Sequence, residues 1–144
     1  MGYPCASSKN AQRLSLLGKG LVVLVGIGHD ETTEDLTWLT KKLVQLRIFD
    51  DEAGVMNRSV MDIEGEIMIA SQFTLHAMTK KGNRPSWINA APEAISKPLY
   101  EEFVKMVESA VGHDVATGSF GADMQIELTN DGPVTIWIDS KNRE

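Results

Sequence analysis

The sequence predicts a β-rich mixed α/β domain, with a compact sheet or barrel-like core covered by two amphipathic helices. A short, continuous apolar run at 21–27 is typical of a strand buried on both faces. Two segments, at about 32–47 and 98–111, repeat apolar residues with the period of a helix. Further strand-like segments follow at 124–128 and 134–138. Because strands and helices alternate along the chain, we expect the helices to pack on the sheet.

The composition fits one globular domain, so we assign residues 1–144 to a single domain. The 144 residues are 42% hydrophobic and 24% charged, which is typical of a soluble domain with a real core. The run at 21–27 is too short to cross a bilayer, and residues 1–20 lack the pattern of a secretory signal. Cys5 is the one cysteine, which excludes an internal disulfide and a multi-cysteine metal site. We therefore expect a cytoplasmic protein.

The charge balance is acidic. The chain has 14 Lys and Arg against 20 Asp and Glu, and its formal net charge is −6. A protein that binds nucleic acid without specificity draws its affinity from neutralising phosphates and is usually basic. The balance therefore excludes that class of protein, but it leaves room for a local basic patch that contacts one end of an RNA.

The start of the chain is the exception to the regular pattern. Residues 1–17 show no clear periodicity and have a polar middle, so we expect a poorly ordered or atypical segment. From residue 18 onward the sequence reads as a compact fold. Its first element is the β-branched strand at 21–27.

The first helix carries the expected signals at both ends. Thr32 or Thr33 is a suitable N-cap. Glu34 and Asp35 in the first turn and Arg47 in the last turn match the helix dipole. The apolar stripe of this helix consists of Leu36, Leu39, Leu43 and Leu46.

The second half of the chain is predicted to hold three strands and one helix. A strand is expected at 66–75, with apolar residues alternating between its faces, followed by a long polar loop at 76–98. A loop of that length is usually functional or mobile. The second helix should end at Gly112. The last two strands are joined by the turn residues 129–133.

Polar groups gather at the end of the strand at 66–75. Ser71, Gln72 and Thr74 either satisfy neighbouring backbone groups or form a site where backbone N–H groups stabilise an oxyanion. No histidine lies at a spacing that supports a serine-hydrolase triad. The three histidines also lack the spacing of metal ligands, so we expect no metal.

Two further segments leave alternatives open. Gly132-Pro133 forms either an ordinary turn or a cis bond, which occurs in ~5–6% of X-Pro bonds and would reorient the Gly132 carbonyl. The run 79–85 is the densest positive cluster and contains Lys80, Lys81 and Arg84. It is either a solvated loop or a patch that contacts phosphates.

Taken together, these motifs resemble the D-aminoacyl-tRNA deacylase family. The likeness runs from about residue 18 to 141 and rests on Ser71-Gln72-Phe73-Thr74-Leu75, 79–86, Phe120-Gly121-Ala122-Asp123-Met124 and 130–135, with 46–49 and 54–57 in support. The resemblance implies a cytoplasmic homodimer that needs no metal or organic cofactor. It also implies tRNA editing: hydrolysis of the ester between a D-amino acid, or mischarged glycine, and the terminal adenosine of tRNA.

The resemblance further implies a role for each motif. Ser71, Gln72, Phe73 and Thr74 form the catalytic wall, where backbone N–H groups near Phe73 face the scissile carbonyl and Thr74 has an auxiliary role. The adenosine 2′-hydroxyl assists the attacking water. Gly132 and Pro133 form a cis element that enters the partner subunit's pocket, holds the substrate α-amino group and excludes an L side chain. Phe120 and Met124 lie close to the pocket, and Lys80, Lys81 and Arg84 meet tRNA phosphates.

The amino-terminal segment departs from the family pattern. Members begin with a strand resembling Met-Arg-Val-Val-Ile-Gln-Arg-Val, whereas Met1–Leu17 has no such pattern. Either the start is divergent, the start site or reading frame is altered, or the first strand is lost. This departure leaves an alternative function: a non-catalytic RNA- or partner-binding relative that keeps the pocket but has lost activity.

Overall fold

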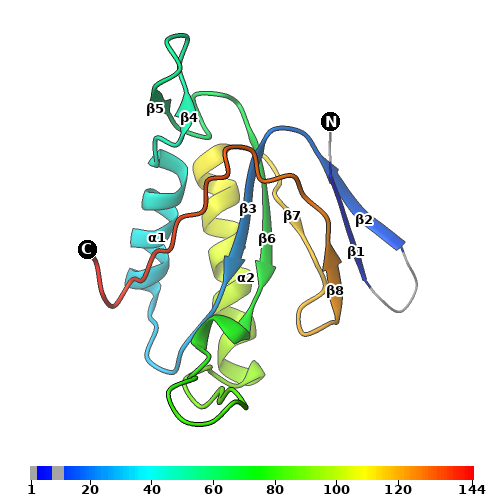
Figure 1. Ribbon diagram of the computed structural model, residues 1–144, viewed down its shortest axis with the longest axis vertical. Coiled ribbons are helices and arrows are strands. Elements are labelled where there is room, and N and C mark those ends of the chain that lie inside the picture. The colour runs from blue at the N-terminus through cyan, green and yellow to red at the C-terminus, as the bar shows by residue number, and fades with distance from the viewer. Residues whose placement is uncertain (1–2, 8–11) are drawn as a thin grey trace.

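A parallel three-stranded sheet lies at the centre of the molecule (Figure 1). The computed structural model describes residues 3–7 and 12–144. The sheet has the order β3 (Gly20–Val25), β6 (Glu66–Ser71) and β7 (Ala116–Thr117), and both pairings are parallel. The expected alternation along 66–75 is wrong, because residues 67–70 of β6 are all at most 2% exposed. A central strand covered on both faces is apolar at consecutive positions.

Two α-helices cover one face of this sheet and pack against each other, as expected. They are α1 (Thr33–Gln45) and α2 (Glu93–Val111). The core joins side chains of α1, α2 and β6, and its most buried members include Leu36, Ile67, Ile69, Phe103 and Val107. In this α/β arrangement the apolar stripe of each helix is buried against the strands. Neither helix is long and apolar enough to cross a membrane, a finding that covers the described part of the chain.

The helix ends agree only in part with the expectation. Thr32 is the N-cap of α1, and its backbone N–H donates to the Asp35 carboxylate at 2.9 Å. Arg47 lies beyond the helix, since Leu46 is the C-cap, so Lys42 is the cation of the last turn. α2 begins at Glu93 and contains Pro98 rather than starting there. The expected start at about 98 is therefore wrong by five residues, and the proline lies within the helix.

Gly112 ends α2, as expected. It has φ 79° and donates its N–H to the carbonyl of Glu108 at 2.8 Å. A left-handed conformation at this position is open to glycine without steric cost. The local sequence therefore determines where α2 ends.

The expectation of an irregular or missing amino-terminal strand is wrong for the described residues. β1 (Tyr3–Ser7) and β2 (Gln12–Leu17) pair antiparallel, and β1 also pairs with β8 (Met124–Ile126). Residues 1–2 and 8–11 lie outside the described residues. β2 pairs with its neighbour β1, whereas the second partner of β1, β8, lies more than a hundred positions away and is not revealed by local periodicity. A small hairpin of β4 (Phe49–Asp50) and β5 (Met56–Arg58) completes the strands of the described chain.

The predicted strand at 134–138 is also wrong. β8 ends at Ile126, and no strand is formed after it in the described chain. The Asn130 side chain instead organises a turn: its oxygen accepts the Val134 N–H at 3.0 Å, and its amide donates to the Thr135 hydroxyl at 2.9 Å. Of the apolar residues that suggested a strand, Ile136 and Trp137 are exposed, at 52% and 67%, and Val134 and Ile138 are half-buried.

Candidate active site

The candidate site lies at the carboxyl end of the parallel sheet. Val25 of β3 is opposite Ser71 of β6, and Ile69 of β6 is opposite Thr117 of β7. In parallel strands these ends point to the same edge, so the turn after Ser71 and the loop after Thr117 leave the sheet side by side. Carboxyl edges of parallel sheets are a common place for ligand sites in α/β proteins.

The turn after Ser71 is the 3-10 helix η1 (Phe73–His76). The Gln72 N–H donates to the carbonyl of Val25 at 2.8 Å, which fastens the turn to β3. The Gln72 side-chain amide is hydrogen-bonded to the Thr74 hydroxyl. The structure therefore holds both polar side chains close to their own backbone.

Gly26 makes this tight turn possible, and the sequence analysis did not identify it as part of the site. A β-carbon at position 26 would lie 3.0 Å from the His76 ring and 3.1 Å from both the Gln72 carbonyl and the Leu75 side chain. Any larger residue would push the turn away from β3. The available signal was a glycine placed directly after β3, a strand wrongly expected to be buried on both faces, since Val22 is 37% and Leu24 44% exposed.

Two backbone donors in the turn have no internal acceptor. The N–H groups of Phe73 and Thr74 form no hydrogen bond with any residue in the described chain, whereas Leu75 bonds back to Gln72. Phe73 and Thr74 are consecutive, so their donors leave the same side of the turn. Adjacent free N–H groups of this kind suit an oxygen that develops negative charge.

An exposed aromatic pair stands beside the turn. The Phe73 ring is 56% exposed and meets Trp87 edge-on, with ring centroids 5.4 Å apart and planes at 80°. Trp87 comes from the loop after η1, which Met78 and Ser86 close by two backbone hydrogen bonds of 2.8 and 3.0 Å. Trp87 was not identified from the sequence, because its contact with Phe73 arises only when this loop folds back.

The basic residues occupy the tip of the same loop. Lys80, Lys81 and Arg84 are exposed, and none forms an ion pair with a described residue. The expected long loop is present but spans 77–92 rather than 76–98, because α2 already begins at Glu93, and it presents three cations to solvent after η1. Their role stays a prediction.

Phe120 and Met124 lie on the neighbouring loop and strand. Phe120 packs against Tyr100 with centroids 5.4 Å apart, and the buried Tyr100 hydroxyl donates to the Ile69 carbonyl of β6 at 2.8 Å. Met124 covers Gly118, where a β-carbon would lie 2.2 Å from the methionine sulfur. These contacts place both predicted residues beside β7, and their role in the site stays a prediction. Tyr100, missed in the sequence, positions Phe120.

Gly132 and Pro133 are not brought to this turn within one chain. Their peptide bond is cis, and Gly132 has φ 128°. No hydrogen bond connects 71–74 with 130–135 anywhere in the described residues. In Figure 1, η1 lies at the lower end of the sheet, whereas the segment that follows β8 passes near the upper end.

No cluster of three or more His, Cys, Asp or Glu side chains with the geometry of a metal site occurs among residues 3–7 and 12–144. His76 follows the turn, but its Nε2 atom is buried and makes no hydrogen bond. The turn itself presents backbone donors, the Gln72 and Thr74 side chains and the Phe73 ring.

Known proteins resemble this chain over most of its length. Residues 6–139 match the model of a family described as D-Tyr-tRNA(Tyr) deacylase. A D-aminoacyl-tRNA deacylase of Bacteroides thetaiotaomicron is 60% identical over 130 residues, covering 90% of this chain and 87% of the relative. One of Chromobacterium violaceum is 53% identical over 139 residues, covering 96% and 93%.

Solved structures share the fold. The structure titled c-Myc DNA Unwinding Element Binding Protein has a TM-score of 0.85 and 35% identity, covering 93% of this chain and 89% of its own. A probable eukaryotic D-amino acid tRNA deacylase has a TM-score of 0.73 and 19% identity, covering 87% and 88%. At 19% identity, the similarity to this second structure shows a shared fold and nothing more.

Proposed function

The chain belongs to the D-Tyr-tRNA(Tyr) deacylase family, and on that premise we propose that it hydrolyses the ester between a D-amino acid, or mischarged glycine, and the terminal adenosine of tRNA. The observation that carries this function is the family match over 6–139, which spans the turn at 71–75 and Gly132-Pro133. The reaction is a proofreading step of translation, and we place the protein in the cytoplasm with its tRNA substrate.

The turn at 71–74 serves as the oxyanion site of this reaction. Water attacks the ester carbonyl, the oxygen of the tetrahedral intermediate takes up negative charge, and collapse of the intermediate releases the amino acid and the adenosine hydroxyl. The free N–H groups of Phe73 and Thr74 are suited to that oxygen. An aminoacyl ester is already activated, so positioning and oxyanion stabilisation suffice without a protein nucleophile. The adenosine 2′-hydroxyl assists the attacking water, and Thr74 is auxiliary.

Chiral selection is assigned to Gly132 and Pro133 of a partner subunit in a homodimer. Within one chain these residues belong to a segment that leads away from η1, so a second copy is needed to bring them to the turn (Figure 1). Exposed apolar side chains on the same segment and on the edge strand β3 support an interface; they include Leu24, Ile136 and Trp137. The carbonyl oxygens of the Gly-Pro element hold the α-amino group and leave no room for an L side chain.

The basic loop is assigned to the tRNA backbone. Lys80, Lys81 and Arg84 are exposed and unpaired with any described carboxylate, so they are available to phosphates. Phe120 and Met124 complete the pocket on the β7 side. This arrangement lets an acidic protein contact one charged RNA end without binding nucleic acid in general.

A deacylation assay with D-tyrosyl-tRNA and L-tyrosyl-tRNA tests the function. We expect release of the D-amino acid and retention of the L-amino acid. Binding of both substrates without turnover would instead support a non-catalytic relative. Sedimentation of the active protein tests the homodimer, since a fully active monomer contradicts a shared site.

A further inference from the structure

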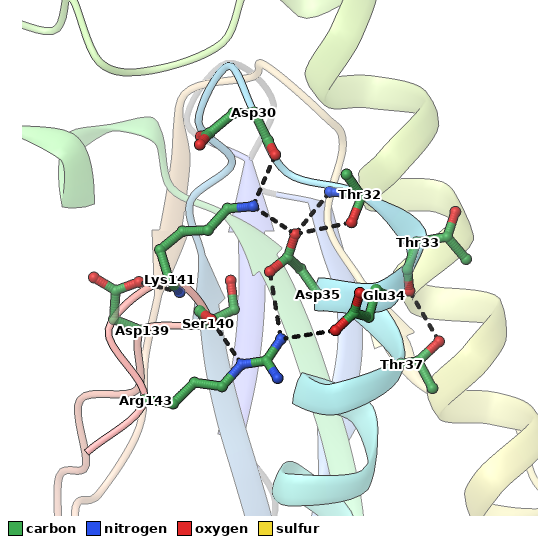
Figure 2. A network of polar contacts seen from close by, with 10 residues as sticks. All are labelled: Asp30, Thr32, Thr33, Glu34, Asp35, Thr37, Asp139, Ser140, Lys141 and Arg143. Atoms are coloured by element: carbon green, nitrogen blue, oxygen red, sulfur yellow. Dashed lines mark hydrogen bonds and ion pairs between the residues drawn. The ribbon is translucent and has the colours of Figure 1, made fainter.

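Residues near the end of the described chain fasten the Gly132-Pro133 segment to the start of α1. We call this cluster the C-terminal clamp and define it as Asp35, Ser140, Lys141 and Arg143 (Figure 2). The Lys141 ammonium group donates to the Asp35 carboxylate and to the Asp30 carbonyl, both at 2.8 Å. The Asp35–Lys141 contact joins residues 106 positions apart.

Arg143 adds a second connection to the same helix. Its Nε donates to the Ser140 carbonyl at 2.8 Å, and its guanidinium group lies 4.8 Å from the centre of the Trp38 ring. Its Nη2 atom is 3.8 Å from the Asp35 carboxylate and 3.7 Å from that of Glu34. The clamp thus surrounds one carboxylate with two cations.

Asp35 is the centre of the clamp because it is both buried and charged. It is 4% exposed, and Ser140 is 8% exposed. Burial would raise the pKa of Asp35, but hydrogen bonds from Lys141, Thr32 and Ser140 together lower it to about 2. Removing the lysine would leave a buried carboxylate without its main partner, which is a costly arrangement.

The segment between β8 and the clamp has few other supports. Residues 127–139 contain no helix or strand, and the side-chain hydrogen bonds of Asn130 stay within that segment. The segment is therefore held by β8 pairing with β1 at one end and by the clamp at the other. A peptide fixed mainly at its ends takes its position from those ends.

We propose that Lys141 is a positioning residue for chiral selection: through Asp35 it fixes the place of the Gly132-Pro133 element. This inference rests on the proposed function. A displacement of ~1 Å in a group that orients the substrate can cost on the order of 10²-fold in rate. A loosened element would hold the D substrate less well and would exclude the L side chain less strictly.

The test compares three variants in the deacylation assay. Lys141→Met removes the clamp cation, and Lys141→Arg restores a cation that can pair with Asp35. Lys42→Met is the matched control, because Lys42 is a cation on α1 whose ammonium group lies 5.6 Å from the centre of the Trp38 ring but has no carboxylate partner in the described chain. The readout is kcat/KM for D-tyrosyl-tRNA divided by kcat/KM for L-tyrosyl-tRNA.

We expect this ratio to fall about tenfold or more in Lys141→Met, through a higher KM for the D substrate and a gain of L hydrolysis. It should recover in Lys141→Arg and stay within about twofold of wild type in Lys42→Met. Hydrogen exchange should become faster in 127–139 but not in β6.

An unchanged ratio in folded Lys141→Met, or an equal loss for both substrates, overturns the proposal. If that variant does not fold, Lys141→Gln provides the same readout, and failure of both to fold shows a purely structural role. A wild-type protein inactive on D-tyrosyl-tRNA contradicts the proposed function instead. In that case the exchange measurement still decides whether the clamp holds the segment.

Discussion

The side-chain amide of Gln72 is hydrogen-bonded to the hydroxyl of Thr74, two positions further along the same turn. The hydroxyl is thus engaged by a neutral amide, and no imidazole or carboxylate among the described residues is hydrogen-bonded to it. A nucleophilic hydroxyl needs a base within hydrogen-bond reach. The contact therefore marks Thr74 as a residue that shapes the turn.

Replacement of this hydroxyl tests that role. Thr74→Ala should retain activity within about tenfold of wild type, because the backbone donors remain in place. The measurement is single-turnover deacylation of D-tyrosyl-tRNA. Thr37→Ala on α1, whose hydroxyl bonds only to the Thr33 carbonyl, is the control. Complete loss of activity in a folded Thr74→Ala protein would make the hydroxyl the nucleophile.

Substitution of Gly132 should impair the chiral element. A β-carbon at this position would lie 2.8 Å from the Val134 side chain, and φ is 128°, a conformation that L residues rarely adopt. We expect Gly132→Ala to lower kcat/KM for D-tyrosyl-tRNA by at least about tenfold. Gly54→Ala is the control, since Gly54 also has positive φ but nothing lies within 4 Å of its β-carbon. It should lose about 1 kcal/mol of stability and keep its activity.

Charge reversal in the basic loop should weaken tRNA binding. Lys80→Glu with Lys81→Glu is expected to raise KM for D-tyrosyl-tRNA by about tenfold and to reduce the dependence of KM on salt. The same variant should hydrolyse a D-tyrosyl ester of adenosine normally, because that substrate lacks the remaining tRNA phosphates. Lys41→Glu with Lys42→Glu on α1 makes the same change in net charge. If the α1 pair raised KM as much as the basic-loop pair, the effect would come from net charge and not from the position of Lys80 and Lys81.

The stability of the protein should fall in acid through Asp35. Its pKa is about 2 in the folded chain and 3.8 as the reference value, so the folded state favours the ionised form. The resulting stabilisation, about 2 kcal/mol, is complete above pH ~5 and is lost as the pH falls toward 2. Urea unfolding at pH 7 and at pH 3 measures this loss. The loss of stability between pH 7 and pH 3 should be smaller in Lys141→Met, because this variant lacks a main cause of the low pKa of Asp35.

Asp51 and Asp62 also have lowered pKa values, chiefly through hydrogen bonds from Asn57 and Ser59 respectively. Both carboxylates are in the region of β5 and not in the clamp. Their contribution to acid sensitivity should therefore persist in Lys141→Met. A variant with the full acid sensitivity of wild type would contradict the assignment to Asp35.

Local sequence was sufficient to predict the start of α1, the end of α2 and the presence of a long loop, because each depends on residues that are close together in the chain. Thr32 with Asp35 begins α1 and Gly112 ends α2, because caps depend on residues within a few positions. The long loop after η1 followed from its Gly, Pro and polar residues. The motifs at 71–75, 120–124 and 130–135 were likewise enough to identify the family resemblance, which the family match confirmed.

Pairing between distant segments was decided only by the tertiary structure. β1 lies between its neighbour β2 and the distant strand β8, whereas 134–138 pairs with no strand in the described chain. Both segments carry residues that suit a strand or a loop, so long-range hydrogen bonding settles the outcome.

At the site, too, the sequence determined some features and the tertiary structure determined others. The sequence by itself determined which side chains and turn residues are present: the polar turn at 71–74, the glycine before Pro133 and three clustered cations. Only the folded chain placed Gly26 beneath that turn, Trp87 against Phe73, and Asp35 against Lys141. Each of these contacts joins segments far apart in sequence, and its energy exists only after packing has brought them together.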